Sequence, residues 1–182
     1  SGIPYWTTDI GGFAVEPRFE RNVKPAALEE WREFQTRWFQ YGTFCPLFRV
    51  HGQFPFREMF NIAPVNHPAY KTMLSYDKLR YRLMPYIYSL TGMVTLDDYT
   101  IMRALVMDFG ADPKVFNIDD QFMFGPALLI NPVTEYKARN RTVYLPSGSD
   151  WYDFHTGRFF KGGQSVNADA PYENIPIFVK TG

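Results

Sequence analysis

Apolar residues in the first fifty positions form two short runs that each end at charged side chains. Residues 3–9 form the first run and residues 44–50 the second, and an amphipathic stretch joins them. This order predicts a strand, a helix and a second strand in a right-handed parallel unit, with both strand ends at the same edge. In barrels and open sheets of this kind, ligands bind at that edge. Four side chains are therefore expected to converge on one pocket rim: Asp9, Phe13, Arg49 and His51.

The stretch between the two runs has the period of an amphipathic helix. Pro25 suits the first turn, where a missing N–H costs nothing, and Gly42 follows the last turn. Glu29 and Glu30 lie near the start, where the helix dipole favours negative charge. Large apolar residues recur every three to four positions, which predicts one wide buried stripe. The stripe consists of Leu28, Trp31, Phe34, Trp38 and Tyr41.

Two more helices are predicted between residue 68 and Val106. Residues 68–92 carry a helical stripe, and Pro85 should kink this helix because it removes a donor and crowds the previous turn. Asp97 or Asp98 is placed to cap a third, short helix that runs to Val106. The stripe of the second helix consists of Leu79, Leu83, Ile87 and Leu90.

From Phe116 onward, short apolar runs alternate with turn residues. Gly125 and Pro126 separate the first two runs, and further glycines and prolines follow the later ones. Turn signals at this spacing are typical of an antiparallel sandwich or barrel. The predicted strands cover residues 122–124, 128–130, 143–145, 151–154 and 175–179.

The change of pattern divides the chain into an α/β part, residues 1–111, and an all-β part, residues 112–182. The stretch from Gly110 to Pro113 is the best linker candidate. Neither part reads as complete, because two parallel strands cannot form a sheet that is covered on both faces. We therefore expect the end of an α/β domain followed by an incomplete β domain.

Composition adds a large aromatic content, with 17 Phe, 12 Tyr and 4 Trp residues. Most of these rings are expected in the core, but Trp and Tyr also stack on the apolar faces of sugars. The 19 basic and 19 acidic residues balance, so no net charge attracts nucleic acid or anionic lipid. A neutral, hydroxyl-rich ligand fits this balance better.

The single cysteine, Cys45, lies among apolar residues and is expected in the core. It excludes an internal disulfide and a thiolate zinc cluster. No apolar run approaches the roughly 20 residues that span a bilayer, so no membrane partner is predicted. No signal peptide is visible, but a chain that starts at Ser1 leaves localisation open, and a periplasmic or extracellular address is compatible with it.

Several motifs together resemble glycoside hydrolase family 31, which contains retaining α-glucosidases and α-xylosidases. Each motif is weak alone, but their order and spacing match the family over essentially the whole chain. The motifs are Asp-Ile-Gly-Gly-Phe at residues 9–13, Arg-Val-His at residues 49–51, and residues 82–88, 120–126, 143–146, 151–153 and 175–179. The Arg-Val-His-Gly form with Pro-Phe-Arg-Glu at residues 55–58 is closer to the α-xylosidase branch.

The resemblance implies that the first part of the chain is the last two βα units of a (β/α)₈ TIM barrel, followed by the start of a β-sandwich. Such enzymes cleave terminal α-linked xylosyl or glucosyl residues from oligosaccharides. Retention requires two carboxyl groups roughly 5–5.5 Å apart, one as nucleophile and one as acid/base. In the family these aspartates lie on earlier strands, upstream of Ser1, so no catalytic residue is expected in this chain and the chain alone is expected to be inactive.

The resemblance also assigns roles to the four side chains at the predicted edge. Phe13 and His51 would contact the sugar, His51 by a hydrogen bond to a hydroxyl and Phe13 through an apolar face. Arg49 and Asp9 would support them, although a plain structural ion pair is equally compatible. Trp6 is either a stacking residue or interior filling, with filling favoured.

Other polar residues are read as structural. Arg57 and Glu58 either shape an outer subsite or form a solvated pair, and the solvated pair is favoured. The adjacent acids Asp97-Asp98 and Asp119-Asp120 suit caps and turns, because neighbours along an extended chain point to opposite faces. The remaining histidines, His67 and His155, lack spaced partners, so no metal and no cofactor are predicted.

Three alternatives remain open at this stage. The β part could be a non-catalytic carbohydrate-binding or scaffolding module, if Trp151, Tyr152 and Tyr172 form an exposed platform. The whole protein could be an α-glucosidase of the same family. The chain could also self-associate through the unpaired edges of its two parallel strands. The apolar side chains on these edges are Ile3, Tyr5, Phe44 and Leu47.

Overall fold

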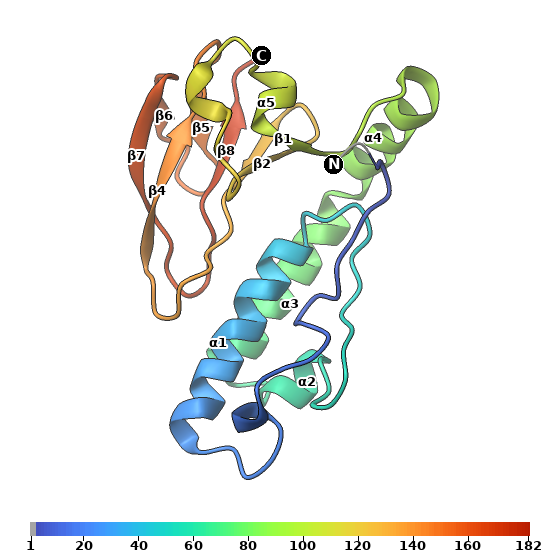
Figure 1. Cartoon of the computed structure of the whole chain (residues 1–182), viewed down its shortest axis with the longest axis vertical. Helices are drawn as coiled ribbons and strands as arrows, with labels where there is room; N and C mark the ends of the chain where they lie inside the picture. Colours follow the sequence, from blue (N-terminus) through green and yellow to red (C-terminus); the bar gives the residue numbers. More distant parts are fainter. Residues whose placement is uncertain (1–2) are drawn as a thin grey trace.

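The computed structural model describes residues 3–182, in which a helical region is followed by a region of strands (Figure 1). The strands gather on one side of the long helices, and the segments that precede α1 and α2 run along the other side (Figure 1). The helices are η1 (Pro17–Phe19), α1 (Pro25–Gly42), α2 (Met59–Ile62), α3 (Pro68–Arg82), α4 (Met84–Asp97), α5 (Leu105–Asp108) and η2 (Pro113–Val115).

Helix α1 has the predicted bounds, with Pro25 in its first turn and Gly42 as its last residue. The prediction of its buried face is wrong, because only Trp31 of the aromatic stripe is buried. The buried face is largely polar, and its side chains find acceptors and donors on other parts of the chain. The buried polar residues of α1 are Glu33, Gln35, Thr36, Arg37 and Gln40.

The single kinked helix predicted over residues 68–92 is two helices, α3 and α4, which meet at Leu83. Pro85 lies in the first turn of α4, where its missing N–H is harmless, so the chain restarts a helix instead of kinking one. The third predicted helix is also wrong. Asp98 ends α4 in a left-handed conformation (φ 53°), and the chain then enters β1 (Met102–Ala104).

The strand region contains a six-stranded sheet in the order β1-β2-β3-β8-β5-β6 and a separate pair, β4-β7, and all of its pairs are antiparallel. β2 and β3 have the predicted bounds, whereas β1, β6 and β7 were not predicted. The other strands are β2 (Phe122–Phe124), β3 (Leu128–Ile130), β4 (Asn140–Leu145), β5 (Trp151–Asp153), β6 (Phe159–Phe160), β7 (Gln164–Asp169) and β8 (Ile177–Lys180).

The two predicted parallel strands are not regular strands. One parallel bridge, Ile10 to Val50, joins the segments. The amide of Ile10 donates to Arg49 O (3.3 Å), and the amides of His51 and Leu47 donate to Ile10 O (3.2 Å) and Trp6 O (3.3 Å). All three bonds fit one parallel register. The bonds that the backbone of Thr8 would make in this register do not form. The predicted direction and pairing are present, but two segments alone do not build a covered parallel sheet.

The buried apolar residues form two hydrophobic cores. The first includes Phe39 of α1, Met73 of α3 and Ile87 of α4, and it continues into the sheet through Phe124 and Ile130. The second lies within the strand region, around Leu129, Val143 and Trp151. The first core therefore joins the helices to the six-stranded sheet.

Cys45 is fully buried, as predicted, and burial raises the pKa of its thiol to about 11. A buried thiol of this kind is inert at neutral pH. No helix among residues 3–182 is long and apolar enough to cross a membrane.

Candidate functional site

The structure brings the four predicted site residues together where the two paired segments end. Nη2 of Arg49 donates to Oδ1 of Asp9 at 2.8 Å. The rings of Phe13 and His51 lie with their centroids 5.9 Å apart and their planes tilted by 35°. The bridge between Ile10 and Val50 lies beside both pairs, so the parallel register sets their proximity.

This cluster is open to solvent. Phe13 is 50% exposed, and the side chain of Arg49 is 59% exposed. His51 is exposed as well. Two rings in contact with one free side can provide an apolar face and a ring N–H to a bound sugar.

A tight turn sets the position of Phe13. Gly11 and Gly12 both have positive φ (97° and 80°), which only glycine adopts without strain. The amide of Gly12 donates back to Asp9 O at 2.8 Å, and the amide of Gln53 donates to Phe13 O at 2.7 Å. The turn thus folds the chain back beside the segment that carries His51.

Arg57 is part of this arrangement, contrary to the predicted solvated pair with Glu58. Its residue is only 4% exposed, whereas Glu58 is exposed. Nη2 of Arg57 donates to Gly12 O at 2.7 Å and Nε to Gly11 O at 3.2 Å. Burial lowers the pKa of this guanidinium. The sequence around Arg57 does not distinguish a buried arginine from a solvated one. Aromatic residues precede Arg57, which favours burial, and a charged residue follows it, which favours exposure.

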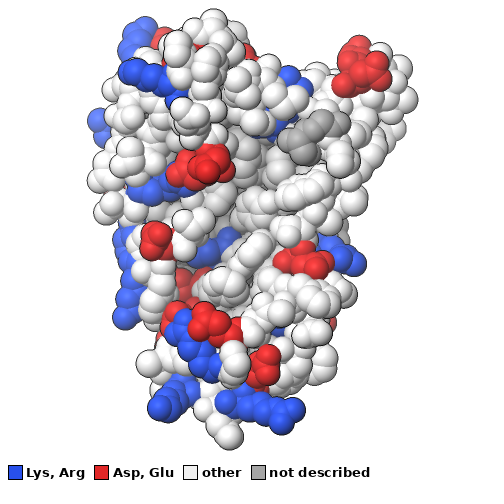
Figure 2. Space-filling model, viewed as in Figure 1, with Lys and Arg blue, Asp and Glu red and all other residues white. Residues whose placement is uncertain are grey.

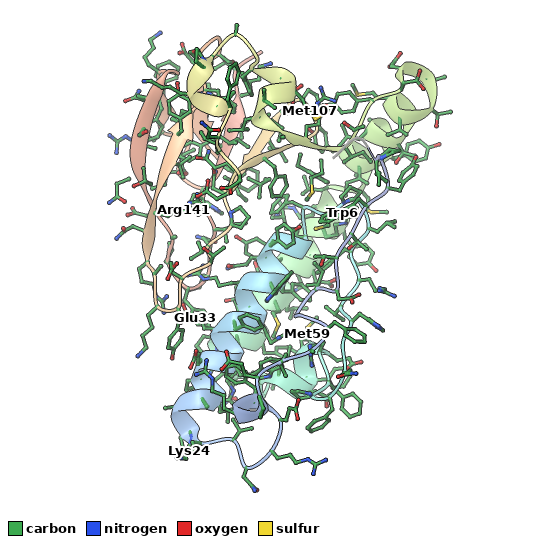
Figure 3. The ribbon with its side chains drawn as sticks, in the orientation of Figure 1. Trp6, Lys24, Glu33, Met59, Met107 and Arg141 are labelled. Carbon is green, nitrogen blue, oxygen red and sulfur yellow. The ribbon has the colours of Figure 1, made fainter. Side chains whose placement is uncertain are left out.

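The unburied aromatic stripe of α1 lines a groove between the helical and strand regions. The groove has a volume of about 1070 Å³. Trp6 forms part of the groove wall, so its side chain is neither fully buried nor fully exposed. Figure 3 shows Trp6 among the segments beside α1. Neighbouring rings of the stripe pack edge to face, with the centroids of Phe34 and Trp38 6.2 Å apart and those of Trp38 and Tyr41 5.8 Å apart.

The exposed sugar platform considered for the strand region does not form. Trp151 is fully buried, and its Nε1 donates to Pro146 O at 3.1 Å. Tyr172 lies against α1, where its hydroxyl is 3.2 Å from Oγ1 of Thr36. Of the three rings only Tyr152 is exposed, and it packs on Phe159. The platform expected from Trp151, Tyr152 and Tyr172 is therefore absent.

The remaining histidines have structural partners. His67 caps α3 by accepting from the amide of Ala69 at 3.1 Å, and Nε2 of His155 lies 2.9 Å from Ile175 O. No group of three or more His, Cys, Asp or Glu side chains is spaced to hold a metal ion within residues 3–182. Acidic and basic side chains are interspersed on the face drawn in Figure 2, with no large patch of one sign.

Two family models match adjacent parts of the chain. The model described as glycosyl hydrolases family 31 TIM-barrel domain matches residues 1–90. The model described as glycosyl hydrolase family 31 C-terminal domain matches residues 98–182.

Known proteins with similar sequence or structure cover the whole chain. An α-xylosidase of Saccharolobus solfataricus is 46% identical over all of this chain, which spans 23% of that protein. The crystal structure of a family 31 α-xylosidase from Xanthomonas citri is 56% identical over 98% of this chain, with a TM-score of 0.95, and 19% of that structure is covered. Alpha-glucosidase 2 of Bacillus thermoamyloliquefaciens is 31% identical over all of this chain and 21% of its own length. The chain thus spans about a fifth to a quarter of these relatives.

Proposed function

Because this chain belongs to glycosyl hydrolase family 31, we propose that it is the last part of the catalytic barrel, with the start of the following β-sandwich, of a retaining α-glycosidase. The enzyme would remove terminal α-linked xylosyl or glucosyl residues from oligosaccharides. Its nucleophile and acid/base aspartates would lie in a part of the enzyme outside these residues. We also propose that residues 1–111 belong to the barrel and residues 112–182 to the sandwich, with β1 and β2 paired across this boundary.

The contact between the Phe13 and His51 rings carries the proposal for the site. The two side chains lie 38 residues apart in the sequence, yet their ring centroids are only 5.9 Å apart. In the proposed role, Phe13 packs on an apolar face of the sugar, and a ring nitrogen of His51 donates to a hydroxyl. Arg49 supports this pair by holding the Asp9 side chain beside it through a charge-assisted bond.

We favour α-xylosidase over α-glucosidase specificity. The α-xylosidases compared above are 46% and 56% identical to this chain, whereas the α-glucosidase is 31% identical. A direct test compares aryl α-xyloside and aryl α-glucoside as substrates of the longer enzyme. A higher kcat/KM on the α-xyloside is expected, and the reverse order would assign the enzyme to the α-glucosidases.

The roles of the two rings are tested in the same enzyme by His51→Ala and Phe13→Ala. Loss of a hydrogen bond that strengthens in the transition state costs about a hundredfold or more in rate, so kcat/KM should fall by that factor for His51→Ala. His67→Ala and Phe116→Ala are matched controls, since His67 caps α3 and Phe116 is an exposed ring in the strand region. An activity of His51→Ala equal to that of His67→Ala would contradict the proposed contact.

The 182-residue chain by itself is expected to show no turnover of aryl α-glycosides, because a retaining reaction needs both carboxyl groups. The assay compares the purified chain with its His51→Ala variant. Turnover that co-purifies with the chain and disappears in the variant would show that the reaction centre lies in this segment.

We further propose that the chain alone self-associates through the two loosely paired segments. Ile3, Tyr5 and Leu47 are exposed there, and an apolar edge with free backbone groups recruits another chain. Phe44, expected on the same edge, is instead buried and packs on Phe124 at 5.8 Å. Each Å² of apolar surface buried in such an association contributes about 25 cal/mol.

Light scattering over a range of concentrations tests this association. Leu47→Lys should shift the chain toward monomer, because a charge on an edge opposes pairing. Leu96→Lys is the control, since Leu96 is also an exposed leucine but lies on α4. A chain that stays monomeric throughout, with strongly protected amides in residues 3–9, would rule the association out.

A further inference from the structure

We infer that Arg57 is a positioning residue for the Phe13–His51 pair, holding the backbone of the Gly11–Gly12 turn from which Phe13 projects. The inference rests on the proposed role of these two rings in sugar binding. Arg57 lies outside the two motifs that carry Phe13 and His51. Its side chain binds the turn, which lies 45 and 46 residues earlier in the chain.

The turn needs an external clamp because of its composition. Two consecutive glycines with positive φ have little intrinsic preference for one conformation. Nε of Arg57 binds Gly11 O and Nη2 binds Gly12 O, so one planar group fixes two successive peptide carbonyls. Gln35 of α1 adds a bond from Nε2 to Gly11 O at 2.9 Å. The direction in which the chain leaves the turn, and with it the start of Phe13, follows from these bonds.

The same guanidinium also lies against the residue that follows His51. A Cβ placed on Gly52 would lie 2.6 Å from Nη2 of Arg57 and 2.5 Å from Gly12 O. Because Gly52 has no side chain, the guanidinium of Arg57 fits between the backbone just before Phe13 and the backbone just after His51. One side chain thus relates the two segments that carry the ring pair.

Arg57 is held in place without a carboxylate. No salt-bridge partner lies within 4.0 Å of it among the described residues 3–182. Its guanidinium carbon lies 5.0 Å from the centroid of the Trp31 ring, which favours a cation over its face. Lysine at this position would keep the charge but could not present two donors in one plane to two carbonyls.

Arg80 provides a control of matched chemistry. It is partly buried and donates to three backbone carbonyls, those of Thr43 (2.8 Å), Cys45 (2.7 Å) and Pro46 (2.9 Å). None of these three bonds reaches the Gly11–Gly12 turn or Gly52. Loss of Arg80 should therefore lower stability as loss of Arg57 does, without moving the ring pair.

The experiment compares Arg57→Met, Arg57→Lys and Arg80→Met in the longer enzyme by kcat, KM, melting temperature and crystal structure. Displacing a contact by about 1 Å can cost a hundredfold in rate, so kcat/KM should fall by about that factor in Arg57→Met and less in Arg57→Lys, with a raised KM. The distance between the ring centroids should increase from 5.9 Å. Arg80→Met should keep kcat and KM close to the parent values at a similar loss of melting temperature.

Equal kinetic losses in Arg57→Met and Arg80→Met, or an unchanged ring distance in Arg57→Met, would overturn the inference. Displaced rings with unchanged kinetics would instead uphold the positioning role and reject the sugar contact of the rings. If Arg57→Met does not fold, Arg57→Lys carries the test, because lysine keeps the charge but not the two donors in one plane. Parent kinetics and an unchanged ring distance in Arg57→Lys would then count against the inference.

Discussion

Ion pairs occur both where α1 meets the strand region, here called the joint, and at the edge that carries the candidate site. The ion pair at the joint is buried, whereas the one at the site edge is exposed. At the joint, Glu33 and Arg37 are buried, and Arg37 donates to four backbone carbonyls of the strand region. Figure 3 shows Glu33 on the side of α1 that faces the β4–β7 pair. At the site edge, Arg49 pairs with Asp9 on the surface.

Buried and exposed ion pairs contribute differently to stability. Removing one member of a buried pair leaves an uncompensated charge and is strongly destabilising, whereas an exposed pair contributes little. Glu33 accepts from both Arg139 and the amide of Lys137, so one carboxylate ties α1 to the loop before β4. The joint is thus fixed within the chain, while the site edge keeps its charged groups and rings available to solvent or ligand.

Hydrogen exchange should show the largest difference between the two regions. The amides of β4 and β7 lie in a ladder of six paired positions. The segment of residues 3–9, by contrast, is paired with residues 44–50 next to only one bridge, Ile10 to Val50. Exchange in the centre of the ladder should be slower by roughly a thousandfold or more, since the ladder opens only with extensive unfolding. The measurement is made at a concentration where the chain is monomeric. Similar rates in both places would contradict the contrast.

Glu33→Ala should lower the free energy of unfolding by about 3 kcal/mol or more, because it breaks a buried pair. Glu29→Ala removes a carboxylate of the same helix that is more than half exposed, and should cost less than about 1 kcal/mol. Urea unfolding of the chain, followed by tryptophan fluorescence, measures both. Comparable losses in the two variants would show that burial at the joint does not set the contribution.

Asp112 should make stability depend on acid pH. Burial raises the pKa of this carboxyl, but hydrogen bonds from Tyr144, Ser147 and Lys114 outweigh burial and lower it to about 2, from an ordinary value of 3.8. The stabilisation is therefore complete above pH 3.8 and is lost as the pH falls toward 2. Unfolding measured across this range should show a shallower dependence in Asp112→Asn. Asp119→Asn, at an exposed acid, is the control substitution.

Arg49→Ala should have the smallest effect on stability, less than about 1 kcal/mol, because its pair with Asp9 is exposed and screened by salt. The same urea titration measures it, with and without added salt. A loss as large as that of Glu33→Ala would mean that the site edge depends on this pair as the joint depends on Glu33.

Local sequence signals predicted the elements whose ends are set by their own residues. Pro25 and Gly42 mark the ends of α1, and the turn at Gly125 separates β2 from β3 as expected. The convergence of Asp9, Phe13, Arg49 and His51 followed from the order of the segments and the handedness of their connection. β1 and β7 were missed, because their residues have no strong alternation and become strands only by pairing with β2 and β4.

The sequence alone therefore determined where α1 lies, which motif residues meet and that strands follow helices. The tertiary structure decided which face of α1 is buried and that Arg57 is an interior residue. The reason is the separation of the partners: the carbonyls that bind Arg37 lie more than 100 residues away from it, and those that bind Arg57 lie 45 and 46 residues away. A polar side chain is buried only where such partners arrive, and no local pattern encodes their arrival.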